Sequence, residues 1–225
     1  FLFVLLFMLS TPLQLFGRVT ESAENLLRII HKVNRHWQEN NSPQVRSFWD
    51  NAAYHTGNME VYELTGNTAY LKYSTDWAEY NHWKGAASDN KAEWRYGYGE
   101  TPQYVLFGDW QCCFQTYADL YGIRGDDWKI ARAREVMEYQ MGTDKNDYWW
   151  WADGLYMVMP VMTKLYRITK NPLYLEKLYE YFSYADSVMY DPEVGLYYRD
   201  GSFVYPKHSI LGGKKDFWAR GDGWV

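Results

Sequence analysis

The sequence predicts an all-α fold, a toroid of helical hairpins that carries one short inserted β-hairpin. A similar segment recurs three times along the 225-residue chain, beginning at Val61, Leu120 and Leu165. In each repeat an apolar helix leads into a turn, and an amphipathic helix follows the turn. Residue alternation typical of strands occurs in only one stretch, residues 195–206.

Short turns link the predicted helices at residue pairs that commonly end or start helices. These pairs are Gly66-Asn67, Gly125-Asp126 and Asn171-Pro172. The helix before the third turn, "WADGLYMVMPVMTKLY", is apolar almost all round, whereas the helix after it mixes Lys and Glu with aromatic residues. An inner buried helix therefore alternates with an outer solvated one, which favours a toroid over a flat bundle.

One stretch follows a strand pattern instead. Residues 195–206, "GLYYRDGSFVYP", alternate in polarity around Asp200-Gly201, a pair that favours a tight turn. We expect a β-hairpin here, inserted between helical repeats and turning at this pair.

The composition favours carbohydrate as the partner. Aromatic residues make up 20% of the chain, and aromatic rings cover the flat apolar faces of sugars, although many also fill protein cores. The net charge of -5 argues against a nucleic-acid partner, because nucleic acids usually require a basic surface.

No cofactor or metal is expected. Cys112 and Cys113 are adjacent in an apolar helical pattern, where a disulfide would be strained, so we interpret them as packing residues. The glycine-rich stretch "GYGETP" lacks the Lys-Ser/Thr of a phosphate-binding loop, and we expect it to form a turn at a pocket rim. Four histidines have no metal-ligand spacing: His31, His36, His55 and His82.

The first residues are typical of a secretory signal. Residues 1–9 are uniformly apolar, a run too short to span a bilayer but suited to the hydrophobic part of a signal peptide. We expect residues 1–17 to be the remnant of a signal peptide. The protein is then exported, to the periplasm or the extracellular space, with no membrane insertion after removal of the signal.

An aspartate stands near a tryptophan at the start of four predicted inner helices: "FWDNAAYH", "FGDWQCCFQTY", "WWADGLYM" and "FWARGDGWV". Inner-helix starts converge on one face of a toroid, so their carboxyls are expected to line one aromatic pocket. A single aspartate at such a place is as readily explained by helix capping, but four beside tryptophans favour a site. They are Asp50, Asp109, Asp153 and Asp222.

Four blocks in order resemble the unsaturated glucuronyl and rhamnogalacturonyl hydrolases of glycoside hydrolase family 105. They are "GDWQCCFQTYADLY", "WWWADGLYMVMPVMTKLYRIT", "DPEVGLYYRD" and "FWARGDGWV". The likeness is strongest over residues 100–225, and the form "RGDGWV" makes the related family 88 a more distant fit. The resemblance implies an (α/α)6 barrel, of which residues 18–225 would be the N-terminal part, because six hairpins need a longer chain.

The resemblance also implies removal of a 4,5-unsaturated uronic acid from lyase-generated oligosaccharides. In such enzymes a carboxylic acid protonates C4 of the C4=C5 bond, water adds at C5, and the hemiketal opens to release the leaving sugar. Asp153 is the predicted proton donor and water-activating base, its pKa raised by burial among Trp149, Trp150 and Trp151. Asp109 matches the second acidic position and is predicted to raise the pKa of Asp153 and bind sugar hydroxyls.

Substrate-binding positions follow from the same resemblance. Trp218 and Arg220 match a W-x-R-G motif, and Arg220 is expected to pair with the uronate carboxylate, with an ordinary surface ion pair as the alternative. Members carry a substrate-contacting His either in the loop of His208 or on the preceding hairpin, where this chain has Arg199. The predicted set is completed by Trp49, Asp50 and Trp151.

Two other functions stay open. A direct inverting glycosidase on the same toroid would need two carboxyls about 6.5–9.5 Å apart. A non-catalytic glycan-binding or epimerase-like toroid is the third interpretation, although binding alone needs no buried aspartate and such epimerases rely on paired histidines. Loss of the ultraviolet absorbance of the conjugated double bond would single out the unsaturated uronyl hydrolase.

Overall fold

The computed structural model describes residues 22–225, and the chain divides into two units, residues 1–43 and 44–225. In the first unit a helix runs over residues 22–40. The predicted signal segment at residues 1–17 lies outside the described residues. Over the described range, no helix combines the length and the apolar character that crossing a bilayer requires.

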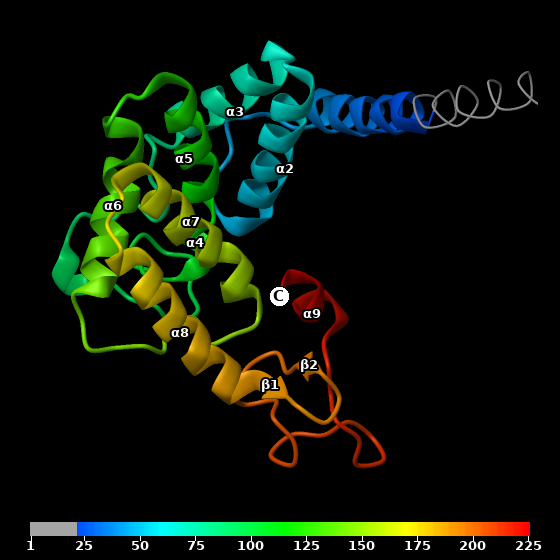
Figure 1. Cartoon of the computed structure of the whole chain (residues 1–225), viewed down its shortest axis with the longest axis vertical. Helices are drawn as coiled ribbons and strands as arrows, with labels where there is room; N and C mark the ends of the chain where they lie inside the picture. The colour runs from blue at the N-terminus through cyan, green and yellow to red at the C-terminus, as the bar shows by residue number, and fades with distance from the viewer. Residues whose placement is uncertain (1–21) are drawn as a thin grey trace, which may run out of the picture. The chain divides into compact units, whose positions relative to one another are not determined.

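The second unit is mostly helical, as the sequence predicts (Figure 1). Within residues 44–225 it contains eight α-helices and one short 3-10 helix, η1 (Lys91–Glu93). The α-helices are α2 (Trp49–Thr65), α3 (Thr68–Tyr80), α4 (Gly108–Gln111), α5 (Cys113–Arg124), α6 (Trp128–Met141), α7 (Asp153–Thr169), α8 (Leu173–Met189) and α9 (Ala219–Trp224).

Consecutive helices pack as hairpins, α2 against α3, α5 against α6 and α7 against α8. Gly66, at φ 65°, ends α2, and the Asn67 side chain accepts a hydrogen bond from the Ala69 N–H at the start of α3. Gly125, at φ 71°, ends α5 in the same way. In the third turn the left-handed residue is Lys170, at φ 59°, one position before the predicted pair.

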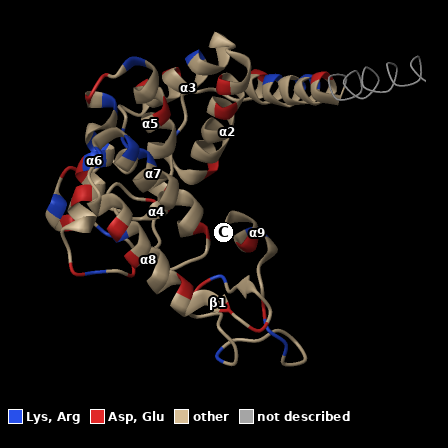
Figure 2. Ribbon diagram, viewed as in Figure 1, with Lys and Arg blue, Asp and Glu red and all other residues tan. Residues whose placement is uncertain are grey.

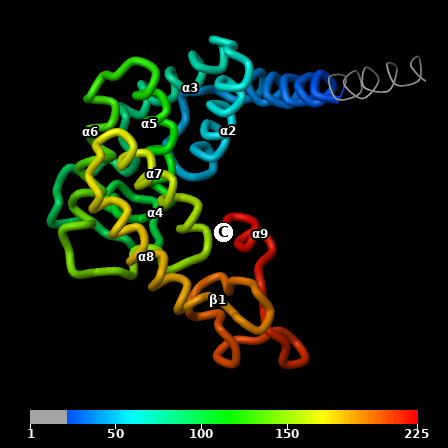
Figure 3. The backbone as a smooth tube through the Cα atoms, in the orientation of Figure 1, coloured from blue at the N-terminus to red at the C-terminus, as the bar shows by residue number. Residues whose placement is uncertain are grey.

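The first helices of the hairpins also pack on one another. Both α2 and α7 contact α5, which is buried along most of its length. Charged side chains are frequent on α6 and α8, the second helices of their hairpins (Figure 2). Figure 3 follows the chain through the hairpins in order, from cyan to yellow. The arrangement is consistent with a toroid of hairpins, while its closure into a six-hairpin barrel stays a prediction.

The β-hairpin lies earlier in the chain than predicted. Strand β1 (Tyr190–Asp191) pairs antiparallel with β2 (Leu196–Tyr197), and the turn between them ends at Gly195, at φ 75°. The prediction that the hairpin turns at Asp200-Gly201 is therefore wrong, although β2 falls within the predicted range.

Local hydrogen bonds explain the difference. The Asp200 carboxylate accepts hydrogen bonds from the backbone N–H and the hydroxyl of Ser202, which closes a tight turn. The backbone of Asp200 forms an isolated β-bridge with Trp151, and the Arg199 carbonyl accepts a hydrogen bond of 2.9 Å from the Ala152 N–H. This stretch pairs with the segment that leads into α7 rather than with itself.

Candidate active site

Residues at the starts of α2, α4, α7 and α9 line a pocket of about 590 Å³, together with residues of the loops around them. The lining is mostly aromatic, with charged side chains of both signs among the rings. It consists of Trp49, Tyr98, Phe107, Asp109, Trp150, Trp151, Asp153, Arg199, Phe203, Asp216, Phe217, Trp218 and Arg220.

Two predicted carboxyls meet in this pocket. Asp109 lies in the first turn of α4 and Asp153 in the first turn of α7, and each residue is only 7% exposed. The Trp151 ring packs against a glycine beside each aspartate: a Cβ would come within 2.9 Å of the ring at Gly108 and within 3.2 Å at Gly154. The two glycines therefore let α4 and α7 close on one indole ring, which brings both carboxyls to the same pocket.

The pKa values of both carboxyls are raised. Burial, and after it the negative charge of Asp153, raise the pKa of Asp109 to about 7. Burial also raises the pKa of Asp153 to about 6, although the positive charges of Arg220 and Arg199 oppose this rise. The influence between the two carboxyls is therefore the reverse of the predicted one: Asp153 raises the pKa of Asp109. Between pH 6 and pH 7 the two carboxyls therefore hold about one proton between them. The Asp153 Oδ1 atom is buried and has no hydrogen-bond partner among residues 22–225.

Two of the three consecutive tryptophans build the wall of the pocket. Trp150 and Trp151 lie 4.8 Å apart between ring centroids, and Phe107 packs on Trp151 at 4.8 Å. Trp149 does not line this pocket but turns into the core, where its ring meets that of Tyr181 at 5.3 Å. Of the three tryptophans that were predicted to bury Asp153, only Trp150 and Trp151 therefore line the pocket with it.

Arg220 presents an unpaired guanidinium to the pocket. The group lies over the Trp218 ring at 4.3 Å and over the Trp49 ring at 5.3 Å. In the described part of the chain it has no hydrogen-bond or ion-pair partner, so the alternative of an ordinary surface ion pair is not observed. Its donors can therefore meet a carboxylate of a ligand.

Arg199 also lines the pocket, whereas His208 does not. The Arg199 guanidinium donates from Nε to Asp200 Oδ2 at 3.1 Å and lies over the Phe203 ring at 4.5 Å. The Nε2 atom of His208 lies 2.7 Å from Oδ2 of Asp216, which is a lining residue. Of the two places considered for a substrate-contacting side chain, the structure thus brings the one occupied by Arg199 into the pocket.

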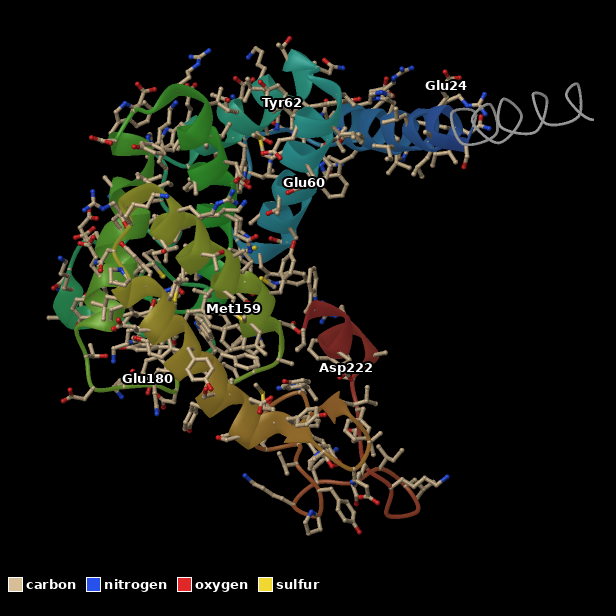
Figure 4. The ribbon with its side chains drawn as sticks, in the orientation of Figure 1. Glu24, Glu60, Tyr62, Met159, Glu180 and Asp222 are labelled. Atoms are coloured by element: carbon tan, nitrogen blue, oxygen red, sulfur yellow. The ribbon has the colours of Figure 1, made fainter. Side chains whose placement is uncertain are left out.

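Asp50 and Asp222 start their helices as expected but do not line the pocket. Asp50 is exposed and lies 3.5 Å from a guanidinium nitrogen of Arg46. Asp222, which Figure 4 labels on α9, accepts at Oδ1 a hydrogen bond of 2.7 Å from the Tyr197 N–H, and this bond ties α9 to β2. The expectation that four aspartates share one pocket therefore holds for two.

Five lining residues were outside the sequence-based set: Tyr98, Phe107, Phe203, Asp216 and Phe217. Tyr98 lies in the "GYGETP" turn that was expected at a pocket rim. Phe107 and Phe217 are the first residues of two blocks that carry predicted site residues, and Asp216 directly precedes the second block, so adjacency was the only signal available for them. No feature of the sequence pointed to Phe203 as a pocket residue.

Within residues 22–225 no group of three or more His, Cys, Asp or Glu side chains is arranged to hold a metal ion. The cysteines and His55 lie outside the pocket and have structural roles. Cys112 and Cys113 are fully buried, and burial raises the pKa of both thiols. His55 stacks on Trp77 at 3.9 Å, and burial lowers the pKa of its ring to about 3.

Comparison with known proteins gives a family match and several relatives. The family model of Glycosyl Hydrolase Family 88 matches residues 23–225. A relative from Formosa agariphila, an unsaturated 3S-rhamnoglycuronyl hydrolase, is 26% identical over 190 residues, which cover 79% of this chain and 48% of that protein. A relative of the same name from an Alteromonas species is 35% identical over 77 residues, which cover 34% of this chain and 18% of the relative.

Solved structures agree with this match. A family 88 glycosyl hydrolase from Bacteroides vulgatus is 71% identical with a TM-score of 0.88, covering 89% of this chain and 58% of its own. A polysaccharide lyase shares the same identity and TM-score over 91% of this chain and 58% of its own. A family 105 hydrolase from C. acetobutylicum, 19% identical with a TM-score of 0.59, shares the fold over 83% of this chain and 53% of its own. The chain thus spans about half the length of the first curated relative.

Proposed function

The chain belongs to glycosyl hydrolase family 88, and from this membership we propose that the whole enzyme removes a 4,5-unsaturated uronic acid from the non-reducing end of lyase-generated oligosaccharides. The observation that carries the proposal is the pair of buried carboxyls, Asp109 and Asp153, with pKa values raised to about 7 and about 6 beside an unpaired Arg220. The two curated relatives, unsaturated 3S-rhamnoglycuronyl hydrolases, support the same reaction class. The resemblance to the unsaturated uronyl hydrolases of family 105 stays part of the proposal.

The reaction begins with a proton transfer. Asp153, protonated and buried against Trp150 and Trp151, delivers its proton to C4 of the C4=C5 bond. The positive charge that develops at C5 is shared with the ring oxygen. A water molecule then adds at C5 and gives up its proton to the Asp153 carboxylate, which restores the acid.

The addition of water yields a hemiketal at C5. When the hemiketal opens, its hydroxyl loses a proton, a C5 ketone forms, and the bond between C5 and the ring oxygen breaks. The released ring oxygen is then part of a hemiacetal at C1, which collapses to an aldehyde and expels the leaving sugar as an alcohol. The protein therefore needs no nucleophile that attacks the glycosidic bond.

Substrate binding itself favours the protonated acid. The charge of Arg220 is the first of the two influences that lower the pKa of Asp153. When the uronate carboxylate pairs with Arg220, that positive charge is offset. The pKa of Asp153 then rises in the complex, and the acid holds its proton at a pH where the free enzyme has lost it.

Asp109 acts as the partner carboxyl. Its raised pKa means that it shares the proton with Asp153 and can donate a hydrogen bond to a substrate hydroxyl or to Asp153. The aromatic rings around the pair exclude water and provide apolar faces for the sugar ring.

The test is the ultraviolet absorbance of an unsaturated disaccharide incubated with the whole enzyme. The proposal expects the absorbance to fall as the conjugated double bond is lost, together with release of one reducing sugar per double bond. Release of sugar with the absorbance unchanged would favour a direct inverting glycosidase. Binding without turnover would favour a glycan-binding protein.

A second candidate is a polysaccharide lyase, because one solved relative at 71% identity is a lyase. A lyase acts on the same two carbons in the opposite sense: a base removes the C5 proton, the electrons form the C4=C5 bond, and the C4–O4 bond breaks as an acid protonates O4. An arginine on the uronate carboxylate and a carboxyl pair suit both reactions. On a saturated uronate-containing glycan a lyase makes the absorbance rise, whereas the hydrolase leaves it unchanged.

A further inference from the structure

The pocket offers two guanidinium groups to a substrate whose unsaturated uronic acid carries only one carboxylate. Arg199 comes from the loop after β2 and Arg220 from the first turn of α9. The charge of Arg220 acts on both carboxyls of the pair, while the charge of Arg199 acts on Asp153. Since the uronate carboxylate is attached to the reacting carbon C5, we place it with Arg220, the arginine whose charge acts on both carboxyls and whose guanidinium has no partner in the described residues, which leaves Arg199 for another group.

The Arg199 guanidinium is held in place by four features. Its Nε donates to Asp200 Oδ2 at 3.1 Å, and its plane lies over the Phe203 ring at 4.5 Å. The Asp200 carboxylate is itself buried and bound by the Ser202 N–H at 2.7 Å. The backbone at this point is fixed to α7, because the Arg199 carbonyl accepts a hydrogen bond from the Ala152 N–H. Little ordering of the side chain is therefore left for a ligand to bring about.

The outer edge of this guanidinium is available. The Arg199 side chain is 48% exposed, and its terminal amino groups have no partner among the residues that the structure describes. The remaining acidic side chain of the pocket, Asp216, is occupied by His208 at 2.7 Å. A planar fork of two N–H donors fits the oxygens of a carboxylate or a sulfate ester.

We propose that Arg199 binds a second anionic group of the substrate, a sulfate ester or a carboxylate on the sugar that follows the unsaturated uronic acid. The proposal rests on the proposed function, because it places the uronate at Arg220 and the leaving sugar towards Arg199. It makes Arg199 the residue that selects anionic over neutral leaving sugars.

The test uses three unsaturated disaccharides whose leaving sugar is neutral, sulfated or a uronic acid. On at least one anionic substrate, Arg199→Gln is expected to lower kcat/KM about 10- to 100-fold, mainly through KM. On the neutral substrate the loss should be clearly smaller, because that leaving sugar offers Arg199 no anionic group. Arg199→Lys keeps the charge but not the fork and should give an intermediate loss. Comparison of the two anionic substrates tells sulfate from carboxylate.

The matched control is Arg134→Gln on α6, because the Arg134 side chain is also 48% exposed and also bound to one carboxylate, that of Glu138. It should leave all three rates unchanged. An equal loss on all three substrates for Arg199→Gln, or a wild-type enzyme that does not prefer either anionic substrate to the neutral one, would overturn the proposal.

A binding measurement separates this proposal from the proposed function. If the wild-type enzyme turns over none of the three disaccharides, the proposed function fails. Calorimetric binding of the same three compounds to the wild-type protein and to Arg199→Gln then measures the contribution of Arg199 to binding, without any need for turnover. Weaker binding of an anionic compound only would still support the anion site, and equal binding of all three to both proteins would refute it.

Discussion

Asp109 is buried without an ion pair in the described part of the chain, and its pKa is raised from 3.8 to about 7. A carboxyl whose pKa is raised on folding contributes stability that is complete below pH 3.8 and is lost as the pH rises towards 7. The loss amounts to at most about 4 kcal/mol. The fold therefore tolerates a destabilising charge at the point where the proposed chemistry needs a proton.

Asp109→Asn removes this charge and should raise the free energy of unfolding at pH 8, with much less gain at pH 4. Urea unfolding at the two pH values measures the difference. Asp50→Asn is the control, because Asp50 starts α2 in the same way but is exposed, and it should change stability by no more than about 0.5 kcal/mol at either pH. A gain for Asp109→Asn that did not depend on pH would contradict the assignment.

The interplay of Asp153 and Arg220 predicts two different pH profiles. The acid must be protonated, so kcat/KM, which reports the free enzyme, should fall as the pH rises past about 6 to 7. In the complex the uronate offsets the Arg220 charge, so the fall of kcat should lie at higher pH. Arg220→Gln should raise KM and shift the fall of kcat/KM upward. If the fall of kcat/KM stayed at the same pH or moved to lower pH in that variant, Arg220 would not lower the pKa of the acid.

At the scale of elements, the approach of α4 to α7 depends on glycine. A Cβ at Gly108 would lie 2.9 Å from the Trp151 ring and 3.0 Å from Cγ2 of Val158. Gly108→Ala should therefore push the Asp109 turn away from Asp153, lower kcat by an order of magnitude or more, and destabilise the fold by about 1–3 kcal/mol.

Gly57→Ala is the matched control, because Gly57 lies within α2 and a Cβ there meets nothing within 4 Å. It should stabilise the protein by about 0.5–1 kcal/mol and leave kcat unchanged. Thermal unfolding and steady-state rates of the two variants make the comparison. Wild-type kcat in Gly108→Ala would mean that the spacing of the two helices does not matter to the reaction.

The hairpins could be predicted from the sequence because helix ends are local. Gly66 supplies the left-handed conformation and Asn67 a capping oxygen, and both effects need only neighbouring residues. The position of the β-hairpin could not be predicted from the sequence, because it depends on the hydrogen bonds that one polar residue makes. Asp200 looks like a turn residue, but its carboxylate closes a turn with Ser202, and its backbone pairs with Trp151, which is distant in sequence.

The candidate site divides in the same way. The place of Asp109 and Asp153 in the pocket could be predicted, because each stands in the first turn of a helix and the helix starts were expected to face one pocket. The roles of Asp222 and Trp149 could not, because they depend on contacts with Tyr197 and Tyr181 from other elements. Pattern and spacing show which residues start a helix, but only packing shows which of them face a common space.

At the scale of the whole molecule, we propose that the hairpins of residues 44–225 belong to an (α/α)6 barrel. The support is the resemblance in sequence to family 105 and the packing of consecutive helices as hairpins, α2 with α3, α5 with α6 and α7 with α8. The pocket at the helix starts would then lie at one end of that barrel.

We also propose that the protein is exported, because residues 1–9 form an apolar run suited to a secretory signal. Cell fractionation followed by N-terminal sequencing should find the mature enzyme outside the cytoplasm, lacking the residues up to about Gly17. A cytoplasmic protein that retains residues 1–17 would contradict export.

The most direct test of the central claim is the turnover of unsaturated disaccharide by Asp153→Asn, followed by ultraviolet absorbance beside the wild-type enzyme. The amide keeps the size of the side chain but has no proton to deliver to C4, so the rate should fall by about 10²–10⁴-fold. Binding, measured by calorimetry, should persist because Arg220 and the aromatic walls are unchanged. A near wild-type loss of absorbance in Asp153→Asn would contradict the account, and Asp153 would then be a buried carboxyl without a part in the reaction.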